Sequence, residues 1–114
     1  MNTPNTWSAA TWREKQGVAA STAIVRITLG QESHTVVSRW TMWRDTVEVD
    51  GRLVEASLNG VAGTHRFFIT DSERELPASV EVAQVDFHYE IRRVEVGGYP
   101  IPLADYGKNP PRYG

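Results

Sequence analysis

The chain has 114 residues, of which 40% are hydrophobic and 23% are charged, and its formal net charge is −2. This length suits one ordinary domain, and this composition excludes a globally disordered chain. The absence of cysteine excludes disulfides, thiolate metal sites and cysteine nucleophiles. The slightly negative charge gives no general attraction to nucleic acid or to anionic membranes.

The two ends of the chain differ in composition from its middle. Residues 1–17 are expected to form an N-terminal arm with a short helix, residues 18–98 a β core, and residues 99–114 a proline-rich arm of the same single domain. The first five residues have neither the basic nor the apolar stretch of a secretory signal, and no apolar run approaches about 20 residues. We therefore expect a cytoplasmic protein, or part of a particle assembled inside a cell, without a membrane partner.

The first predicted element is the short helix, over residues 6–16. Thr11 followed three residues later by Glu14 fits a capping box, and Gly17 is a typical helix stop.

After residue 17 the apolar pattern changes to a period of two. A strand is predicted around Val25 and Ile27, which share one face with their second neighbours. A turn over residues 30–33 leads to a second strand, with Trp40 facing inward and Arg39 and Trp43 facing outward.

Two Xaa-Gly pairs predict tight turns. Asp50-Gly51 separates two alternating segments and suits the positive φ angles of a type I′ hairpin. Asn59-Gly60 repeats the signal, which predicts a three-stranded meander ending with a strand over residues 65–70. Ser72-Glu73-Arg74-Glu75 fits a second capping box, but Pro77 limits that helix to one turn.

One long strand run is predicted over residues 79–96. Its apolar residues change face twice, which indicates β-bulges near Ala83-Gln84 and near Arg92-Arg93, or a strand bent around a corner. Beyond Gly97-Gly98, the last 16 residues hold four of the six prolines and are expected to run extended outside the sheet. The elements together predict a mostly β fold, a small barrel or sandwich of six or seven strands. The expected core includes Val25, Ile27, Trp40, Val85, Phe87 and Ile91.

The sharpest candidate site is the segment Asp86-Phe87-His88-Tyr89-Glu90. On one strand, Asp86, His88 and Glu90 share a face, and an imidazole between two carboxylates can bind a divalent metal or act as a general base. His34 or His65 could supply a second imidazole. The solvated face of an amphipathic strand explains the same residues more simply. No catalytic residue, metal or cofactor is therefore predicted, and a small β-barrel enzyme or ligand-binding protein remains an alternative.

Arginine lies near an aromatic residue at two outward positions, Arg39 with Trp43 and Arg66 with Phe68. Such pairs on a sheet can hold single-stranded nucleic acid, which is a second alternative. The acidic net charge and the lack of an RNA-recognition motif favour protein contact instead. Arg39 and Trp43 are therefore predicted to bind a protein partner.

The other predicted partner-binding residues lie in the tail: Tyr99, Tyr106, Arg112 and Tyr113. Tyrosine offers rigid amphipathic contact area, and arginine can make bidentate contacts. Pro110-Pro111-Arg112-Tyr113 also resembles the short peptides that WW domains bind. Fixing each backbone residue costs about 1–2 kcal/mol unless contacts offset it. The arm could therefore pack on its own domain or on a neighbour, and we expect it to lie across a neighbouring subunit.

The sequence thus favours a non-enzymatic protein-interaction or structural β-domain in a homo-oligomer or a larger assembly, such as an accessory component of a virion or phage particle. The expected partner is a protein, either another copy or another subunit. A nucleic-acid partner is not expected, and the sequence identifies no small-molecule ligand.

Overall fold

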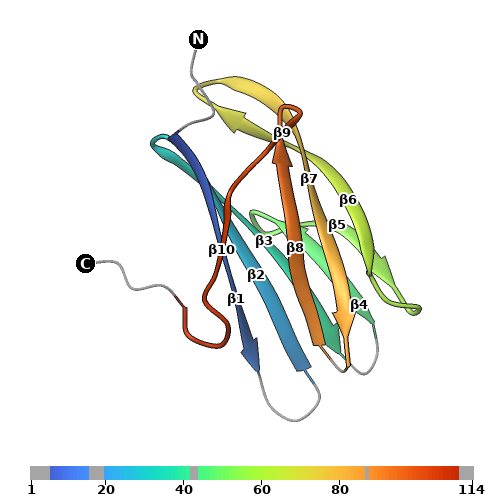
Figure 1. Cartoon of the computed structure of the whole chain (residues 1–114). Coiled ribbons are helices and arrows are strands. Elements are labelled where there is room, and N and C mark those ends of the chain that lie inside the picture. Colours follow the sequence, from blue (N-terminus) through green and yellow to red (C-terminus); the bar gives the residue numbers. More distant parts are fainter. Residues whose placement is uncertain (1–5, 16–19, 42–43, 87, 111–114) are drawn as a thin grey trace.

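The structure is a computed structural model, and it describes residues 6–15, 20–41, 44–86 and 88–110. These residues form ten β-strands in two sheets that face each other, and no α-helix occurs among them (Figure 1). The predicted mostly β class is confirmed. The expectation of six or seven strands is wrong, and so is the barrel alternative, because the two sheets do not close on themselves. No helix that could cross a membrane is found in the described ranges.

The two sheets differ in width. In spatial order, the six-stranded sheet consists of β10 (Leu103–Asp105), β1 (Trp7–Lys15), β2 (Ala20–Leu29), β3 (Glu32–Thr41), β4 (Asp45–Val49) and β5 (Arg52–Ser57). The four-stranded sheet consists of β6 (Gly63–Asp71), β7 (Arg74–Val85), β8 (His88–Val96) and β9 (Tyr99–Pro100). Neighbouring strands are antiparallel, except for the parallel pair of β1 and β10.

The predicted N-terminal helix is wrong, because its residues form strand β1. Trp7, Ala9 and Thr11 are buried at alternate positions, and β1 pairs with β2 along its whole length. The Thr11 hydroxyl donates to the Ile24 carbonyl at 2.7 Å instead of capping a helix. A capping box contributes only about 1 kcal/mol, which is less than this pairing and burial provide. The expected helix stop at Gly17 lies outside the described residues.

The Asp50-Gly51 turn is confirmed. Its two residues have φ angles of 51° and 82°, and they connect β4 to β5 as a two-residue hairpin loop. These left-handed angles are the ones that a type I′ turn requires.

The meander predicted at Asn59-Gly60 is wrong, because β5 and β6 belong to different sheets. The segment over residues 58–62 crosses from one sheet to the other, and Gly60 adopts a φ of 95° within it. A Cβ atom at Gly60 would lie 2.9 Å from the Tyr89 hydroxyl. Gly60 therefore serves a close approach between the crossing segment and β8, not a hairpin.

The helical turn predicted at residues 72–75 is also wrong. Ser72 and Glu73, with φ angles of 49° and 70°, form a two-residue loop between β6 and β7. Pro77 lies within β7, opposite Phe68. The Pro77 carbonyl accepts from Gly97 N at 2.7 Å, beyond the end of the β7–β8 pairing, so the missing N–H of proline interrupts no ladder bond.

The run over residues 79–96 is split between two strands, β7 and β8, joined by a turn at Asp86, whose φ is 56°. The bulge predicted near Arg92-Arg93 is confirmed, because Glu81 pairs with Arg93 and Val82 pairs with Ile91, which leaves Arg92 unpaired. Around Ala83-Gln84 the pairing is regular, so the bulge predicted there is wrong.

The tail forms strands, contrary to the expectation from its prolines. β9 extends the four-stranded sheet beside β8, and β10 extends the six-stranded sheet beside β1. Figure 1 shows this red segment passing from the end of β8 to the side of β1. Ile101, between the two strands, is buried. The tail thus joins the two sheets along one side of the domain.

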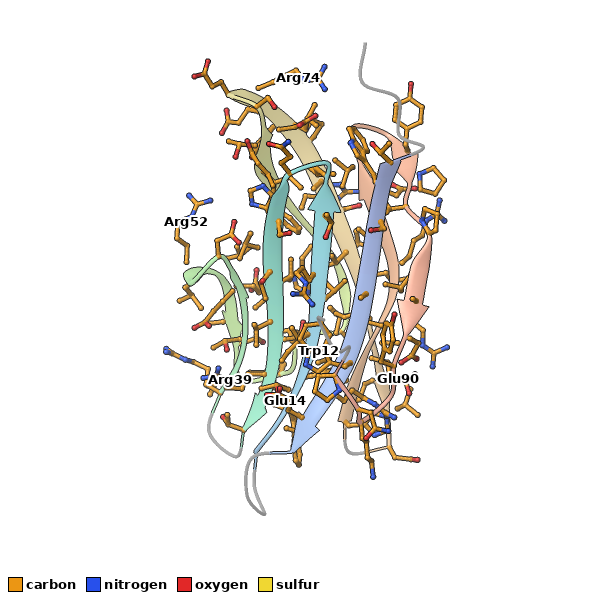
Figure 2. All side chains as sticks on the ribbon, turned by 90° about the vertical axis from the view of Figure 1, so that its left-hand side faces the viewer. Trp12, Glu14, Arg39, Arg52, Arg74 and Glu90 are labelled. Carbon is orange, nitrogen blue, oxygen red and sulfur yellow. The ribbon has the colours of Figure 1, made fainter. Side chains whose placement is uncertain are left out.

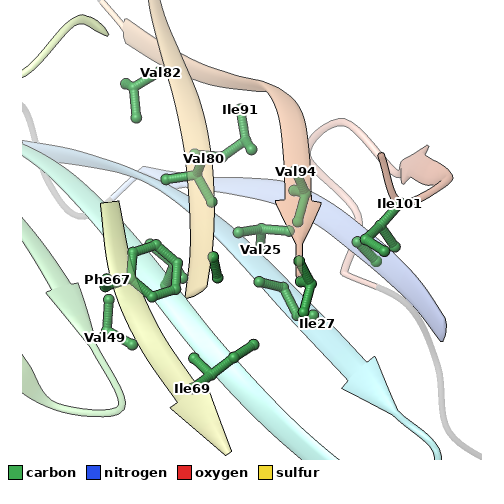
Figure 3. Packing of buried hydrophobic residues seen from close by; sticks show 14 of the residues in the cluster. Val25, Ile27, Val49, Phe67, Ile69, Val80, Val82, Ile91, Val94 and Ile101 are labelled. Carbon is green, nitrogen blue, oxygen red and sulfur yellow. The ribbon is translucent and has the colours of Figure 1, made fainter. Parts of the chain in front are cut away.

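The core lies between the sheets and contains side chains from both of them. Figure 3 shows Val25 and Ile27 facing Val80, Ile91 and their neighbours. The predicted core positions of Val25, Ile27 and Ile91 are confirmed. Trp40 packs against the cluster but is only partly buried, Val85 is half-buried, and Phe87 lies outside the described residues.

Candidate functional site

The candidate residues around His88 are placed on two different elements. His88 and Glu90 lie on β8, and the distance from His88 Nε2 to Glu90 Oε1 is 3.2 Å. Asp86 lies in the preceding turn, with a left-handed backbone and an exposed side chain. The three side chains therefore do not line one strand face as the sequence predicted.

An arginine that the sequence did not single out lies against this pair. Arg13 on β1 places Nη1 2.5 Å from His88 Nε2 and 3.3 Å from Glu90 Oε1. Arg92 contacts the other carboxylate oxygen of Glu90 at 2.8 Å. Because a guanidinium only donates hydrogen bonds, Arg13 occupies the Nε2 lone pair that a general base or metal ligand needs. The cluster is best described as an ion-pair network on β8 that Arg13 connects to the other sheet, and Figure 2 labels Glu90 within it.

No group of three or more His, Cys, Asp or Glu side chains that could hold a metal ion occurs among the residues that the structure describes.

The predicted partner-binding residues are not brought together. Arg39 lies on β3 and is half-buried, whereas Trp43, Arg112 and Tyr113 lie outside the described residues. Tyr99 and Tyr106 remain 49% and 46% exposed. The Tyr99 ring meets Trp7 edge to face, with 6.5 Å between the ring centroids.

Main-chain hydrogen bonds to β1 hold the tail as far as Gly107. Ala9 N donates to the Pro102 carbonyl at 3.1 Å, Tyr106 N donates to Thr11 at 2.9 Å, and Arg13 N donates to Gly107 at 2.7 Å. The reason for expecting a neighbouring subunit to order this segment therefore does not hold.

His34 forms a polar connection between the sheets. Its Nδ1 lies 2.7 Å from Asp50 Oδ2, and its Nε2 lies 2.8 Å from the carbonyl oxygen of Thr70 on β6. Both partners are acceptors, so both ring nitrogens must carry protons in this arrangement. Glu32 lies near the same ring and also accepts from Ser72 N at 2.8 Å. Burial lowers the pKa of His34, but the bonds to Asp50 and Thr70 outweigh it and raise the pKa above 6.5.

The pH dependence of stability should report this histidine. Because the folded state holds the proton more tightly than the unfolded state, the contribution of His34 is complete below pH 6.5 and is lost as the pH rises through the higher folded pKa. We expect His34→Gln to lower the free energy of unfolding by about 1–3 kcal/mol at pH 6. The loss should be smaller at pH values above the folded-state pKa of His34. Urea denaturation followed by tryptophan fluorescence at several pH values measures this. Equal losses at all pH values would contradict the protonated state.

The long edge strand β6 exposes backbone hydrogen-bonding groups. In an antiparallel strand, the N–H and C=O of one residue point to the same side, and successive residues alternate. The Pro77 carbonyl bonds toward β8, so Phe68, opposite Pro77, directs its own N–H and C=O away from β7. The backbone groups of Thr64 and Arg66 also point away from β7. The Thr70 carbonyl points the same way, because it accepts a hydrogen bond from His34 on that side. No strand of the described ranges pairs with this side of β6.

β5, an edge strand of the six-stranded sheet, has features that hinder pairing. The register leaves Val54 as a bulge, since Glu48 pairs with Leu53 and Val47 pairs with Glu55. Arg52 and Glu55 share the inward face with the valines of β4 but are exposed (Figure 2 labels Arg52). Bulges and inward-facing charges are devices that protect edge strands from further pairing.

The other two edges, β9 and β10, are only two and three residues long, and prolines lie in and beside them. Short edges with proline are protected in a similar way. Because β9 pairs only with Glu95 and Val96, the rest of β8 is an edge as well, but it is bulged at Arg92. Among the described strands, β6 is therefore the long edge without a bulge or an inward charge near its middle.

The outer face of the four-stranded sheet is hollowed next to this edge. A shallow groove of about 500 Å³ is lined by Arg66, Phe68, Pro77, Ser79 and Glu95, among others. Phe68 is 58% exposed there. The sequence correctly predicted that Arg66 and Phe68 face outward, but it did not indicate that their strand is an open edge.

Comparison of the chain with protein-family models, with curated proteins and with solved structures gives no match.

Proposed function

We propose that this chain is a non-enzymatic protein-interaction domain of a homo-oligomer or larger assembly, and that it binds its partner as an added strand at the edge of β6. The observation that carries the proposal is the contrast between edges: β6 is long and regular, whereas β5, β9 and β10 are protected. Main-chain bonds at such an edge give affinity, and side-chain pockets beside it give specificity.

Three residues define this open edge, Thr64, Arg66 and Phe68. Their backbone groups point away from β7, and their side chains share the outer face. A partner strand would therefore meet a row of donors and acceptors together with an exposed aromatic ring and the adjoining groove. Burying Phe68 against a partner would remove apolar surface from water, at about 25 cal/mol per Å².

A pair of matched lysine variants tests the proposal. Phe68→Lys adds a charge to the open edge, while Leu53→Lys makes the same kind of change on the protected edge β5, where Leu53 is 56% exposed. We expect a protein captured from an extract of the source cells to be retained by the natural chain and by Leu53→Lys, and to be lost with Phe68→Lys.

Both variants alter exposed side chains, so their thermal melting should stay close to that of the natural chain. A set of captured proteins, or a self-association, that is unchanged by Phe68→Lys would contradict binding at β6.

A further inference from the structure

Resting on the proposed function, we infer that the strand added to β6 is β6 of a second copy of this chain, running antiparallel across a two-fold axis with Arg66 opposite Phe68 of the other copy. The two four-stranded sheets would then form one continuous eight-stranded sheet.

Symmetry limits the possible registers. Two antiparallel edge strands are related by a two-fold axis perpendicular to the sheet, which keeps each side chain on its own face. Residues directly opposite each other must therefore have side chains on the same face. Residues whose backbone groups point to the edge must also lie opposite one another, which pairs even-numbered residues with even-numbered ones. Among the registers that satisfy both conditions, those centred on Arg66, Phe67 or Phe68 place both Arg66 and Phe68 opposite residues of β6.

Charge and hydrogen bonding distinguish these three registers. Centring on Arg66 places two like charges directly opposite each other, which is destabilising. Centring on Phe68 pairs Arg66 with Thr70, whose carbonyl already accepts from His34. Centring on Phe67 pairs Arg66 with Phe68 twice, which allows four main-chain hydrogen bonds that do not involve Thr70. Thr70 then lies opposite Thr64, at the ends of the paired segment.

The side chains complement each other in the register centred on Phe67. Arg66 makes no ion pair or side-chain hydrogen bond within the described residues, and Phe68 is largely exposed. Across the two-fold axis, each guanidinium would meet the ring of the other copy, an attractive cation–π arrangement. The net charge of −2 per chain adds little repulsion to this pairing.

Light scattering coupled to size-exclusion chromatography, over a range of concentrations, tests the inference. The natural chain should reach twice its mass of 12.8 kDa as the concentration rises. Phe68→Lys places lysine opposite Arg66 at two sites, which should weaken dimerisation by about tenfold or more. Leu53→Lys on β5 should dimerise like the natural chain.

Reversing the charge at the same position tests the register. Phe68→Glu places a carboxylate opposite Arg66 at both sites, so this variant should dimerise at least as well as the natural chain. Loss of the dimer in both Phe68 variants would overturn the Arg66–Phe68 register, and a dimer insensitive to Phe68→Lys would overturn pairing through β6. Thermal melting of each variant confirms that the domain is folded.

A natural chain that stays at 12.8 kDa at all concentrations would overturn the second copy as the partner. The extract experiment would then decide the proposed function. A different protein that binds the natural chain and Leu53→Lys but not Phe68→Lys would support it. The two ideas can therefore fail separately.

Discussion

Deletion of residues 99–114 should leave the rest of the chain largely unfolded. The deletion removes β9, β10 and Ile101, whose side chain is only 5% exposed and belongs to the core. Loss of a buried isoleucine side chain alone costs about 2–5 kcal/mol. The total stability of a small domain is about 5–15 kcal/mol. The deletion also removes the pairing of β10 with β1 and of β9 with β8. Together these losses should remove most of the free energy of unfolding.

Circular dichroism and urea denaturation of the truncated chain measure this effect. Ile101→Ala should show a smaller loss of the same origin, whereas Tyr106→Ala, at a half-exposed position on the same segment, should stay within about 1 kcal/mol of the natural chain. A truncated chain with unchanged denaturation would show that the tail only rests on a domain that is complete without it. It would also restore the tail as a candidate for contact with a neighbour.

Tyr89→Phe should lower the free energy of unfolding by about 2–4 kcal/mol. The Tyr89 hydroxyl is buried between the sheets, where it donates to Asp45 Oδ2 on β4 and accepts from Val61 N at 3.0 Å. Burial and the hydrogen bond to Asp45 raise the pKa of Tyr89 to about 12, so the phenol keeps its proton at neutral pH. Removing the hydroxyl deprives the buried carboxylate and the Val61 N–H of a shared partner.

Urea denaturation of Tyr89→Phe, Asp45→Ala and the double variant measures this network. If the two side chains stabilise one another, the double variant should lose less than the sum of the single losses, by about 0.5–3 kcal/mol. Tyr99→Phe serves as the matched control, because Tyr99 is half-exposed. Additive losses would mean that the hydroxyl and the carboxylate contribute independently.

The β class and several local features could be predicted from the sequence because they depend on neighbouring residues. Alternation around Val25 and Ile27 identified the buried face of β2, and the change of face near Arg92 identified a bulge. Asp50-Gly51 identified a turn, because few residue pairs adopt two positive φ angles easily. The outward placement of Arg66 and Phe68 followed from the same alternation.

Elements whose local signals were weak were predicted wrongly where long-range contacts decide the structure. A capping box at residues 11–14 favours a helix slightly, but pairing with β2 and the burial of Trp7 outweigh it. The tail has prolines at positions 100 and 102, and the N–H of Ile101 between them remains available for a hydrogen bond. Ile101 N donates to the Val94 carbonyl at 2.8 Å.

The candidate sites depended on the tertiary structure even more strongly. His34 and Thr70 are 36 residues apart, and Tyr89 and Asp45 are 44 apart, so no local pattern could pair them. The sequence by itself determined which residues alternate, which turns are tight and that Phe68 faces outward. Only the tertiary structure decided that β6 is an open edge, because an edge is defined by the order of strands in a sheet, and that order is set by contacts between distant residues.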